Sequence, residues 1–208
     1  ANEGVNVGIT GRNEEHLKST VAELEKLGVK AAYSVFDVEE MAQVEQGVAS
    51  IASQLGGIDI LINNAGVGDF GSFEDMPVET WEKVMKVNLF GVYYVAKATL
   101  PYLKQNKEGD IVNVASTAGL KGGPNMSAYC ASKAAVISLS QSLMAELRKF
   151  NIRVITLTPS TIATDMSIEG KLTDGNPEKV LQPEDFAEWV RDILKMNRRA
   201  MIASASIF

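Results

Sequence analysis

The sequence has few of the residues that several classes of function require. Its 208 residues include one cysteine and one histidine, which excludes an internal disulfide and leaves too few ligands for a transition-metal cluster. We therefore expect no metal site and a reducing compartment. Basic residues are also not in excess, because 20 Lys and Arg stand against 26 Asp and Glu, a formal net charge of −6. A nucleic-acid partner is not expected from this balance.

Long apolar runs are missing as well. No stretch approaches the roughly 18 uncharged residues of a membrane span, and residues 1–4 lack the basic-then-apolar pattern of a signal peptide. We expect a cytoplasmic protein without a membrane partner. Hydrophobic residues make up 46% of the chain and charged residues 22%, which suffices for a packed core. Residues 1–208 are predicted to form a single domain.

Short β-branched runs alternate with amphipathic helical patterns along the chain. This alternation predicts an α/β fold with a doubly wound parallel sheet, Rossmann-like, covered by helices on both faces. Strands are expected at residues 5–10, 31–35, 58–63, 110–116, 152–158 and 199–203. Apolar residues at helical spacing predict helices near 17–24, 41–55, 78–102 and 127–150, and a last helix after Pro183. The loop at 169–182 reads as an insertion that covers a site.

Two tyrosines are each followed by a lysine four residues later, Tyr93 by Lys97 and Tyr129 by Lys133. This spacing places the phenol and the ammonium on one helix face. Such pairs are expected less than once by chance in this composition. The spacing alone does not choose between the two pairs.

An upstream hydroxyl residue separates the two pairs. Thr80 lies thirteen residues before Tyr93 within one helical pattern, so about 20 Å separates them. Ser116 lies thirteen residues before Tyr129 but ends an apolar run, and glycines between them allow the chain to turn back. Strand end, loop and helix then converge where open α/β sheets bind ligands. We therefore place Ser116, Tyr129 and Lys133 in one site.

These three groups suggest proton transfer. An ammonium about 4 Å from a phenol is worth roughly 4 kcal/mol at an effective dielectric near 20, which is close to three pKa units. Tyr129 is thus expected to have a lowered pKa and to act as an acid or base near pH 7. Ser116 would hydrogen-bond the same substrate oxygen. The chemistry indicated is proton transfer at a carbonyl or an alcohol.

Four motifs follow one another along the chain: Asn-Asn-Ala-Gly at 63–66, Val-Asn-Leu-Phe-Gly at 87–91, Val-Ala-Ser at 114–116 and Tyr-Cys-Ala-Ser-Lys at 129–133. With them the sequence resembles the short-chain dehydrogenases/reductases nearly end to end. Within that family it is most similar to the bacterial 3-oxoacyl-acyl-carrier-protein reductases of fatty acid biosynthesis. The resemblance implies an oxidoreductase that reduces a carbonyl, in a 3-oxoacyl thioester or a related ketone, by hydride transfer from NADPH.

The resemblance also implies catalytic roles. By it, Ser116 orients the carbonyl and Tyr129 donates the proton. Lys133 lowers the phenol pKa and binds the nicotinamide ribose. Asn88 holds a water that leads protons to Lys133.

Cofactor contacts are implied in the same way. Arg12, just after the strand at 5–10, matches a position where a cation pairs with the 2′-phosphate of NADP, so NADP is expected rather than NAD. The other implied contacts lie after later strands: Asp37 and Val38 at the adenine, Asn64, Ala65 and Gly66 beside the adenosine, and Pro159, Ile162 and Thr164 at the nicotinamide amide.

The family's first strand, glycine-rich turn and most of its first helix have no counterpart in the sequence, and by the resemblance they would precede Ala1. That strand is central in the family's sheet, between the strands expected at 5–10 and 58–63. We expect the sheet to be open at this point. No glycine-rich phosphate loop is therefore assigned in this chain.

Other interpretations stay open at this level. The chain could be an NAD-linked alcohol dehydrogenase, or a nucleotide-binding scaffold of the same fold without turnover. Asn88 could instead kink a helix, and Asp37 could cap one. The physiological substrate is not determined, because the loop at 169–182 has no basic cluster for an acidic carrier protein.

The helices expected at 78–102 and 127–150 carry more apolar residues than one face against a sheet requires. A second apolar partner would cover this surface. In the resembling family these helices pair with symmetry mates, so we expect a homotetramer.

Overall fold

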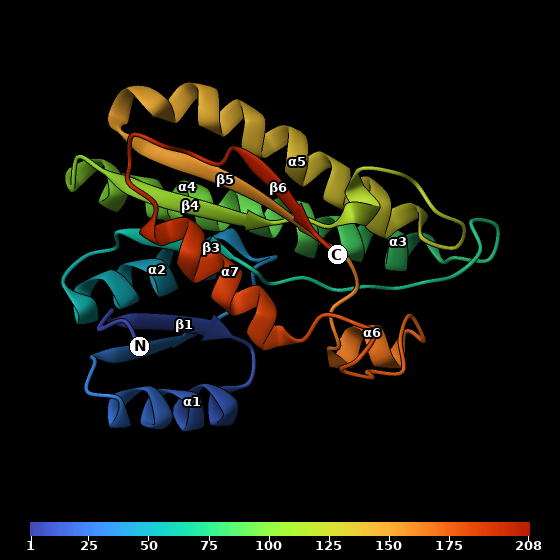
Figure 1. The fold of residues 1–208 in the computed structure, drawn as a ribbon, viewed down its shortest axis with the longest axis horizontal. Helices are drawn as coiled ribbons and strands as arrows, with labels where there is room; N and C mark the ends of the chain where they lie inside the picture. The colour runs from blue at the N-terminus through green and yellow to red at the C-terminus, as the bar shows by residue number, and fades with distance from the viewer.

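Parallel strands and helices alternate along the chain (Figure 1). The computed structural model describes residues 1–208. The strands are β1 (Val7–Gly11), β2 (Ala31–Val35), β3 (Ile60–Asn63), β4 (Gly109–Val114), β5 (Ile152–Pro159) and β6 (Ser204–Ile207). The helices are α1 (Glu14–Lys26), α2 (Met41–Leu55), α3 (Val78–Met85), α4 (Gly91–Gln105), α5 (Ser127–Leu147), α6 (Asp165–Glu169) and α7 (Pro183–Lys195). The predicted α/β class is confirmed.

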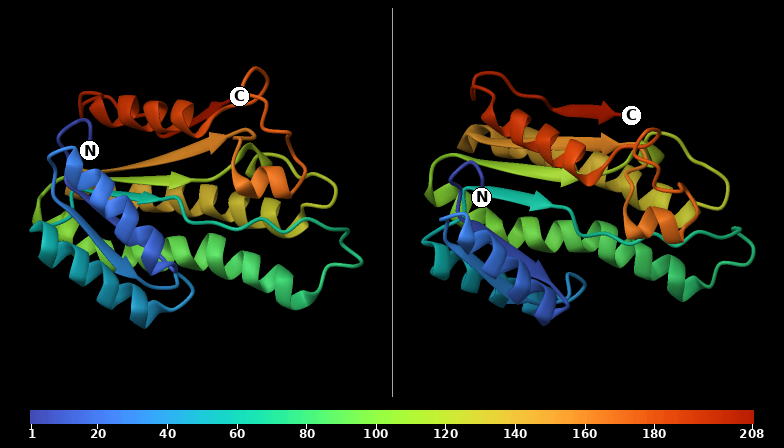
Figure 2. Two further views of the ribbon diagram at one scale, coloured as in Figure 1. Left: turned by 90° about the horizontal axis from the view of Figure 1, so that it is seen from below. Right: turned by 60° about the horizontal axis from the view of Figure 1, so that its bottom comes forward.

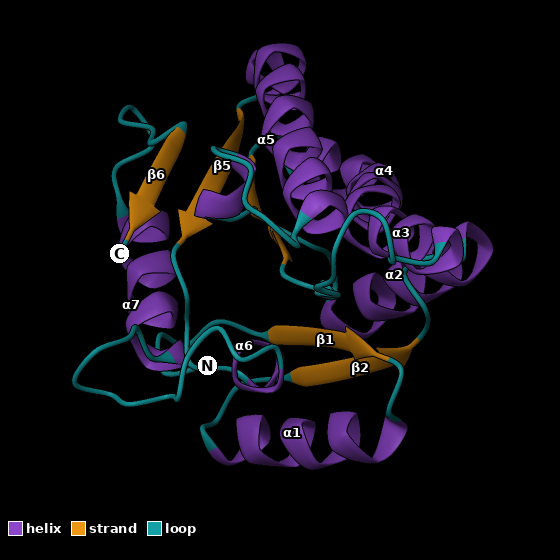
Figure 3. Ribbon diagram, turned by 90° about the vertical axis from the view of Figure 1, so that its right-hand side faces the viewer, coloured by secondary structure: helices purple, strands orange, loops and turns teal.

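The strands form two parallel sheets rather than one. β1 pairs only with β2, and the other four strands pair in the order β3-β4-β5-β6. The division falls between β1 and β3, where the sequence analysis expects the sheet to be open. Figure 3 shows β1 and β2 as a separate layer with α1 on one side and α2 on the other.

Helices cover both faces of the four-stranded sheet. α4 and α5 lie on one face and α7 lies on the other (Figure 2). Neighbouring residues of β4 point to opposite faces: Ile111 packs in the cluster that includes Leu103 and Leu147, and Val112 packs with Val190 and Ile193 of α7. Burial on both faces explains the nearly continuous apolar run of this strand.

An apolar cluster joins the small sheet to the rest of the molecule. Phe36, Val44 and Val48 are buried together, and side chains of α4 including Tyr94 and Tyr102 pack against them. Ion pairs connect Glu3 to Lys195 at 2.7 Å and to Arg191 at 4.0 Å. The two sheets are therefore held in place through α2, α4 and α7.

A chain of buried polar side chains crosses the larger sheet. The Asn63 amide donates to Asn113 Oδ1 at 2.8 Å, and the Asn113 amide donates to Ser140 Oγ at 2.8 Å. Ser140 donates in turn to the Val136 carbonyl at 2.7 Å. β3, β4 and α5 are thereby linked by fully paired polar groups, as buried amides require.

A second buried polar group lies at the amino ends of β4 and β5. The Asp110 carboxylate accepts bonds from the Arg153 guanidinium on both oxygens, and Arg198 adds bonds at 3.2 and 3.3 Å. Arg153 also donates to the carbonyls of Leu194 and Met196. The end of α7 is thereby fastened to the sheet.

Three predicted elements differ from the structure. The last strand is β6, and not 199–203 as predicted, because Asn197 bonds the backbones of Arg199 and Ala200 in a turn. The helix predicted at 78–102 is interrupted by a π-helical segment, Lys86–Phe90. The predicted loop at 169–182 overlaps α6 by one residue, Glu169, at which the helix ends. The start of α6 is capped by Thr164 and Ser167.

No helix is both long enough and apolar enough to cross a bilayer.

Candidate active site

Ser116 follows the carboxyl end of β4 and is 9% exposed. Its hydroxyl accepts a bond from the Ala118 N–H at 3.1 Å and so caps the short 3₁₀ turn Thr117–Gly119. The bond fixes the side chain at the edge of the sheet. A rigid hydroxyl next to α5 is suited to orienting a substrate oxygen.

Tyr129 lies in the first turn of α5, where the chain returns to the sheet edge. Burial raises the pKa of its phenol, and side-chain hydrogen bonding with Ser116 lowers it in part. The predicted meeting of these two hydroxyl groups is therefore found. The ring also packs edge-on against Phe70, with centroids 5.8 Å apart.

Lys133 lies one turn further along α5 and is 5% exposed. Its ammonium donates to the Val114 carbonyl at 2.9 Å and lies 5.7 Å from the centroid of the Tyr129 ring. Burial lowers the pKa of Lys133 to about 8. The expected lowering of the Tyr129 pKa by this ammonium is wrong for this structure, because desolvation of the phenol outweighs the other effects.

Asn88 is fully buried in the π-helical segment between α3 and α4. Its amide clamps the Val67 backbone: Oδ1 accepts from the Val67 N–H at 2.8 Å, and Nδ2 donates to the Val67 carbonyl at 2.9 Å. Nδ2 also donates to Ser132 Oγ at 3.0 Å, and Ser132 donates to the Tyr129 carbonyl. Asn88 thus joins the loop after β3 to the helix that carries Tyr129.

Two glycines allow close approach within the site. A Cβ at Gly66 would lie 3.2 Å from Asn88 Oδ1 and 3.6 Å from Lys133 Nζ. A Cβ at Gly119 would lie 2.7 Å from the backbone of Lys133. The turn after Ser116 therefore packs directly on α5 at the level of the lysine, which only glycine permits.

The predicted cofactor residues at the first two strands meet each other. Arg12 follows β1, Asp37 follows β2, and their side chains form an ion pair at 3.8 Å. The guanidinium is 65% exposed. Asp37 also accepts from the Glu39 N–H in a turn before α2, and Val38 packs against Gly91. These contacts lie apart from the Ser116, Tyr129 and Lys133 group.

The other predicted cofactor residues follow β3 and β5 at the same carboxyl edge. Asn64, Ala65 and Gly66 continue directly from β3, and Pro159 ends β5. Ile162 pairs with Leu181 in a single bridge. Thr164 caps α6 with Ser167. All predicted positions therefore lie at carboxyl ends of strands or in the loops that follow them, except the three helical residues Asn88, Tyr129 and Lys133.

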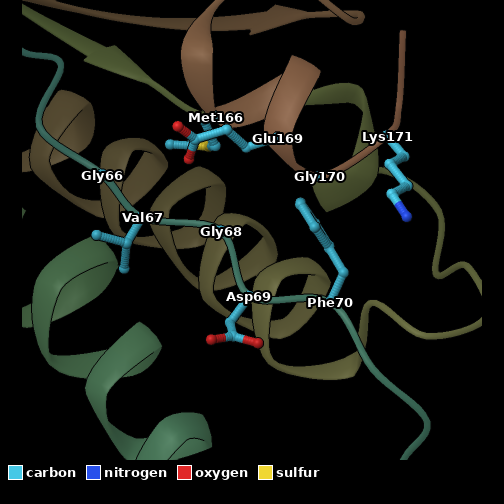
Figure 4. Close-up of a pocket in the computed structure, with 9 residues that line it drawn as sticks. All are labelled: Gly66, Val67, Gly68, Asp69, Phe70, Met166, Glu169, Gly170 and Lys171. Carbon is cyan, nitrogen blue, oxygen red and sulfur yellow. The ribbon is translucent and has the colours of Figure 1, made fainter.

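A cavity of about 520 Å³ opens at Phe70, whose ring packs on Tyr129. The loop Gly66–Phe70 forms one wall and residues 166–171 form the other (Figure 4). Met166, which the sequence places next to Thr164, is one of its lining residues. The cavity has space for a small organic substrate.

The second Tyr–Lys pair is a surface feature. Lys97 donates to the Tyr93 hydroxyl at 3.3 Å, and Tyr93 is 42% exposed on α4. This pair forms a direct hydrogen bond, yet no serine or threonine hydroxyl accompanies it. Position in the fold therefore separates the two pairs as the sequence analysis predicts.

Sequence reasoning missed several residues that build the site. Ser132 and Val67 connect Asn88 to the rest of the site, and Phe70 packs on Tyr129. These contacts join residues 21 to 59 positions apart. A single sequence has no spacing signal for them. Ser132 lies inside the Tyr-Cys-Ala-Ser-Lys motif, which gave the only available indication.

Known proteins support the family and the fold. Residues 1–174 match the family model described as short chain dehydrogenase. The chain is 34% identical to a Xanthobacter autotrophicus protein named inactive 2-(S)-hydroxypropyl-CoM dehydrogenase 2, over 99% of this chain and 93% of the relative. It is 37% identical to a Thermotoga maritima 3-oxoacyl-[acyl-carrier-protein] reductase, over 86% of this chain and 70% of the relative.

Solved structures of similar proteins have the same fold. An actinorhodin polyketide ketoreductase with NADPH matches at a TM-score of 0.90 and 30% identity, over 99% of this chain and 87% of that one. A xylitol dehydrogenase with bound NAD⁺ matches at a TM-score of 0.89 and 28% identity, over 99% and 89%. Proteins similar to this chain thus bind either nicotinamide cofactor.

Proposed function

Because the chain belongs to the short-chain dehydrogenase family, we propose that it is an NADPH-dependent reductase of a carbonyl, in a 3-oxoacyl thioester or a related ketone. The observation that carries the proposal is the meeting of Ser116, Tyr129 and Lys133 beside a cavity. A hydrogen-bonding hydroxyl, a protonated phenol and a buried amine are the groups that carbonyl reduction requires.

The residues present fit a nicotinamide dinucleotide. The Lys133 ammonium has three N–H donors and uses one on Val114, which leaves two for ribose hydroxyl groups. Gly66 has no side chain that would fill the space near the ammonium. Arg12 offers an exposed guanidinium at the end of β1, which favours a cofactor with a 2′-phosphate. When bound, the cofactor would supply the hydride.

The chain's own residues would then handle the substrate oxygen and its proton. Ser116 would donate a hydrogen bond to the carbonyl oxygen, and Tyr129 would donate the proton that completes the alcohol. A raised pKa keeps the Tyr129 phenol protonated near neutrality, which suits a proton donor and hence the direction of reduction. Lys133, with its pKa of about 8, is suited to return a proton to the site.

The test is oxidation of NADPH and of NADH by the full-length protein, measured against a panel of acyl thioesters, diketones and aldehydes. We expect turnover of at least one ketone class with NADPH preferred. Preference for NADH would support an alcohol dehydrogenase linked to NAD. Cofactor binding with no turnover of any carbonyl would support a scaffold without catalysis.

The proton donor is tested by Tyr129→Phe, which keeps the ring and removes the hydroxyl. Turnover should fall by at least about 10²-fold, the usual contribution of a general acid, and NADPH binding should persist. The matched control is Tyr93→Phe, which alters the other Tyr–Lys pair and should leave turnover unchanged. The reverse result would place the active site on α4.

A further inference from the structure

The Phe70 ring packs closely against two glycines from distant parts of the chain. A Cβ at Gly68 and a Cβ at Gly170 would each lie 2.8 Å from atoms of the ring. Neither glycine has a positive φ, so their backbone conformations do not require glycine. The close approach of the ring does require it.

The same ring contacts the proton donor of the proposed reaction. Its centroid lies 5.8 Å from that of Tyr129, with the planes at 66°. The loop that carries it is anchored by a bond from the Gly71 N–H to the Asn125 carbonyl at 2.9 Å. Phe70 therefore holds a fixed place between the phenol and the residues that follow α6.

The cavity beside this ring is lined by three apolar side chains, three charged side chains and three glycines. Val67, Phe70 and Met166 supply the apolar side chains. Asp69, Glu169 and Lys171 are exposed. Figure 4 shows the Phe70 ring directed from its loop toward Gly170, so that it spans the space between the two walls.

We propose that the Phe70 ring sets the size limit for the substrate substituent next to the reacting carbonyl, which is therefore short. This inference rests on the proposed function, because it takes Tyr129 as the group that protonates the carbonyl. The Phe70 ring lines the cavity and packs on Tyr129, so a carbonyl at the phenol places its substituent against the ring. Val67, Phe70 and Met166 offer apolar contacts to an alkyl substituent.

The experiment compares methyl ketones of increasing alkyl bulk in the wild type, Phe70→Ala and Phe73→Ala. Phe73 lies in the same loop but is 82% exposed, so it serves as the matched control. We expect Phe70→Ala to raise the ratio of kcat/KM for bulky ketones to kcat/KM for small ones by at least about tenfold. A change of a few carbons in an apolar pocket changes substrate discrimination by about this factor. Phe70→Leu should give an intermediate ratio, and Phe73→Ala should keep the wild-type ratio.

Affinities provide a readout that does not depend on turnover. Dissociation constants of the same ketones, measured by saturation-transfer NMR with oxidised cofactor present, should show the same shift toward bulky ketones in Phe70→Ala. If no ketone is turned over but the affinities of Phe70→Ala still shift toward bulky ketones, the proposed function is rejected and the size limit set by Phe70 is retained. Equal loss for all ketones, an unchanged size ratio, or no ketone binding to the wild type would overturn the role of Phe70.

Discussion

The side-chain amine of Lys133 is buried in the site, and burial lowers the pKa of this amine from 10.5 to about 8. Below pH 8 the group is protonated in the folded and the unfolded chain, so the folded state carries the full cost of a buried ammonium. Between pH 8 and 10.5 the unfolded chain binds more protons, and stability rises with pH. The pKa difference corresponds to about 3 kcal/mol at about 1.36 kcal/mol per unit.

Lys133→Met should reveal this dependence. The unfolding free energy of the wild type, relative to the variant, should rise by about 3 kcal/mol between pH 7 and 10.5. Urea denaturation at a series of pH values measures it, with Lys97→Met as the control for loss of one surface charge. A difference between wild type and Lys133→Met that does not change with pH would contradict the lowered pKa.

Arg12 lies at the end of β1 with its guanidinium mostly exposed and Asp37 at 3.8 Å. Arg12→Ala should weaken NADPH binding by roughly 1.5 to 3 kcal/mol through loss of a charge-assisted bond to the 2′-phosphate. NADH lacks that phosphate and should bind almost as before, which makes it the internal control in a fluorescence titration. Equal weakening of both cofactors would show that Arg12 does not contact the phosphate.

At the scale of residues, the sequence predicts which side chains come together more successfully than it predicts their orientations. The four-residue spacing correctly puts Tyr129 and Lys133 on one helix face. It does not reveal that the lysine donates to the Val114 carbonyl, or that burial of the phenol decides the sign of the Tyr129 pKa shift. Likewise, Gly170 has no local signal, because the ring that it packs against comes from a distant loop.

Among elements, α7 depends on a buried ion cluster at the end opposite Ser116. Asp110 and Arg153 are 5% and 6% exposed, and Arg153 holds the carbonyls at the end of α7. Asp110→Asn would leave this guanidinium without its counter-charge. We expect a loss of about 3 kcal/mol in unfolding free energy, as for other broken buried pairs.

Chemical denaturation measures this loss, and Glu108→Gln is the matched control. Glu108 pairs with Arg198 at 3.5 Å but its side chain is 59% exposed, so its removal should cost less than about 1 kcal/mol. Because the cluster lies at the amino ends of the strands, kcat of folded Asp110→Asn should stay near the wild-type value. Similar stability in both variants would show that the buried cluster contributes little.

The elements themselves are predicted well where a periodic pattern is long and poorly where geometry interrupts it. The apolar pattern over 78–102 runs on without a break, so it gives no sign of the π-helical segment that aims Asn88 at Val67. The last strand is displaced because the turn at Asn197 is formed by side-chain bonds that no periodicity records. Asp110 and Arg153 lie 43 residues apart, beyond any local pattern.

For the whole molecule, exposed apolar side chains gather on α3, the π-helical segment and α4. Val78, Phe90 and Tyr93 are 67%, 45% and 42% exposed. Val136 of α5, which the sequence analysis counts in the apolar excess, is buried instead. A contact between copies would cover the remaining surface, and we predict a homotetramer. Light scattering of the full-length protein at micromolar concentration should give four chain masses. The mass of a single chain would contradict the prediction, and the mass of a dimer would show that only one of the expected interfaces forms.

The buried chain of Asn63, Asn113 and Ser140 also determines how the strands can be aligned. A slip of two residues between β3 and β4 would keep every apolar side chain on its own face, so the core alone would tolerate it. It would also leave buried amide groups unpaired, at about 1 to 3 kcal/mol each. The polar chain therefore specifies one register. After such a two-residue slip, Ser116 would be displaced by roughly 7 Å along its strand relative to the loop after β3.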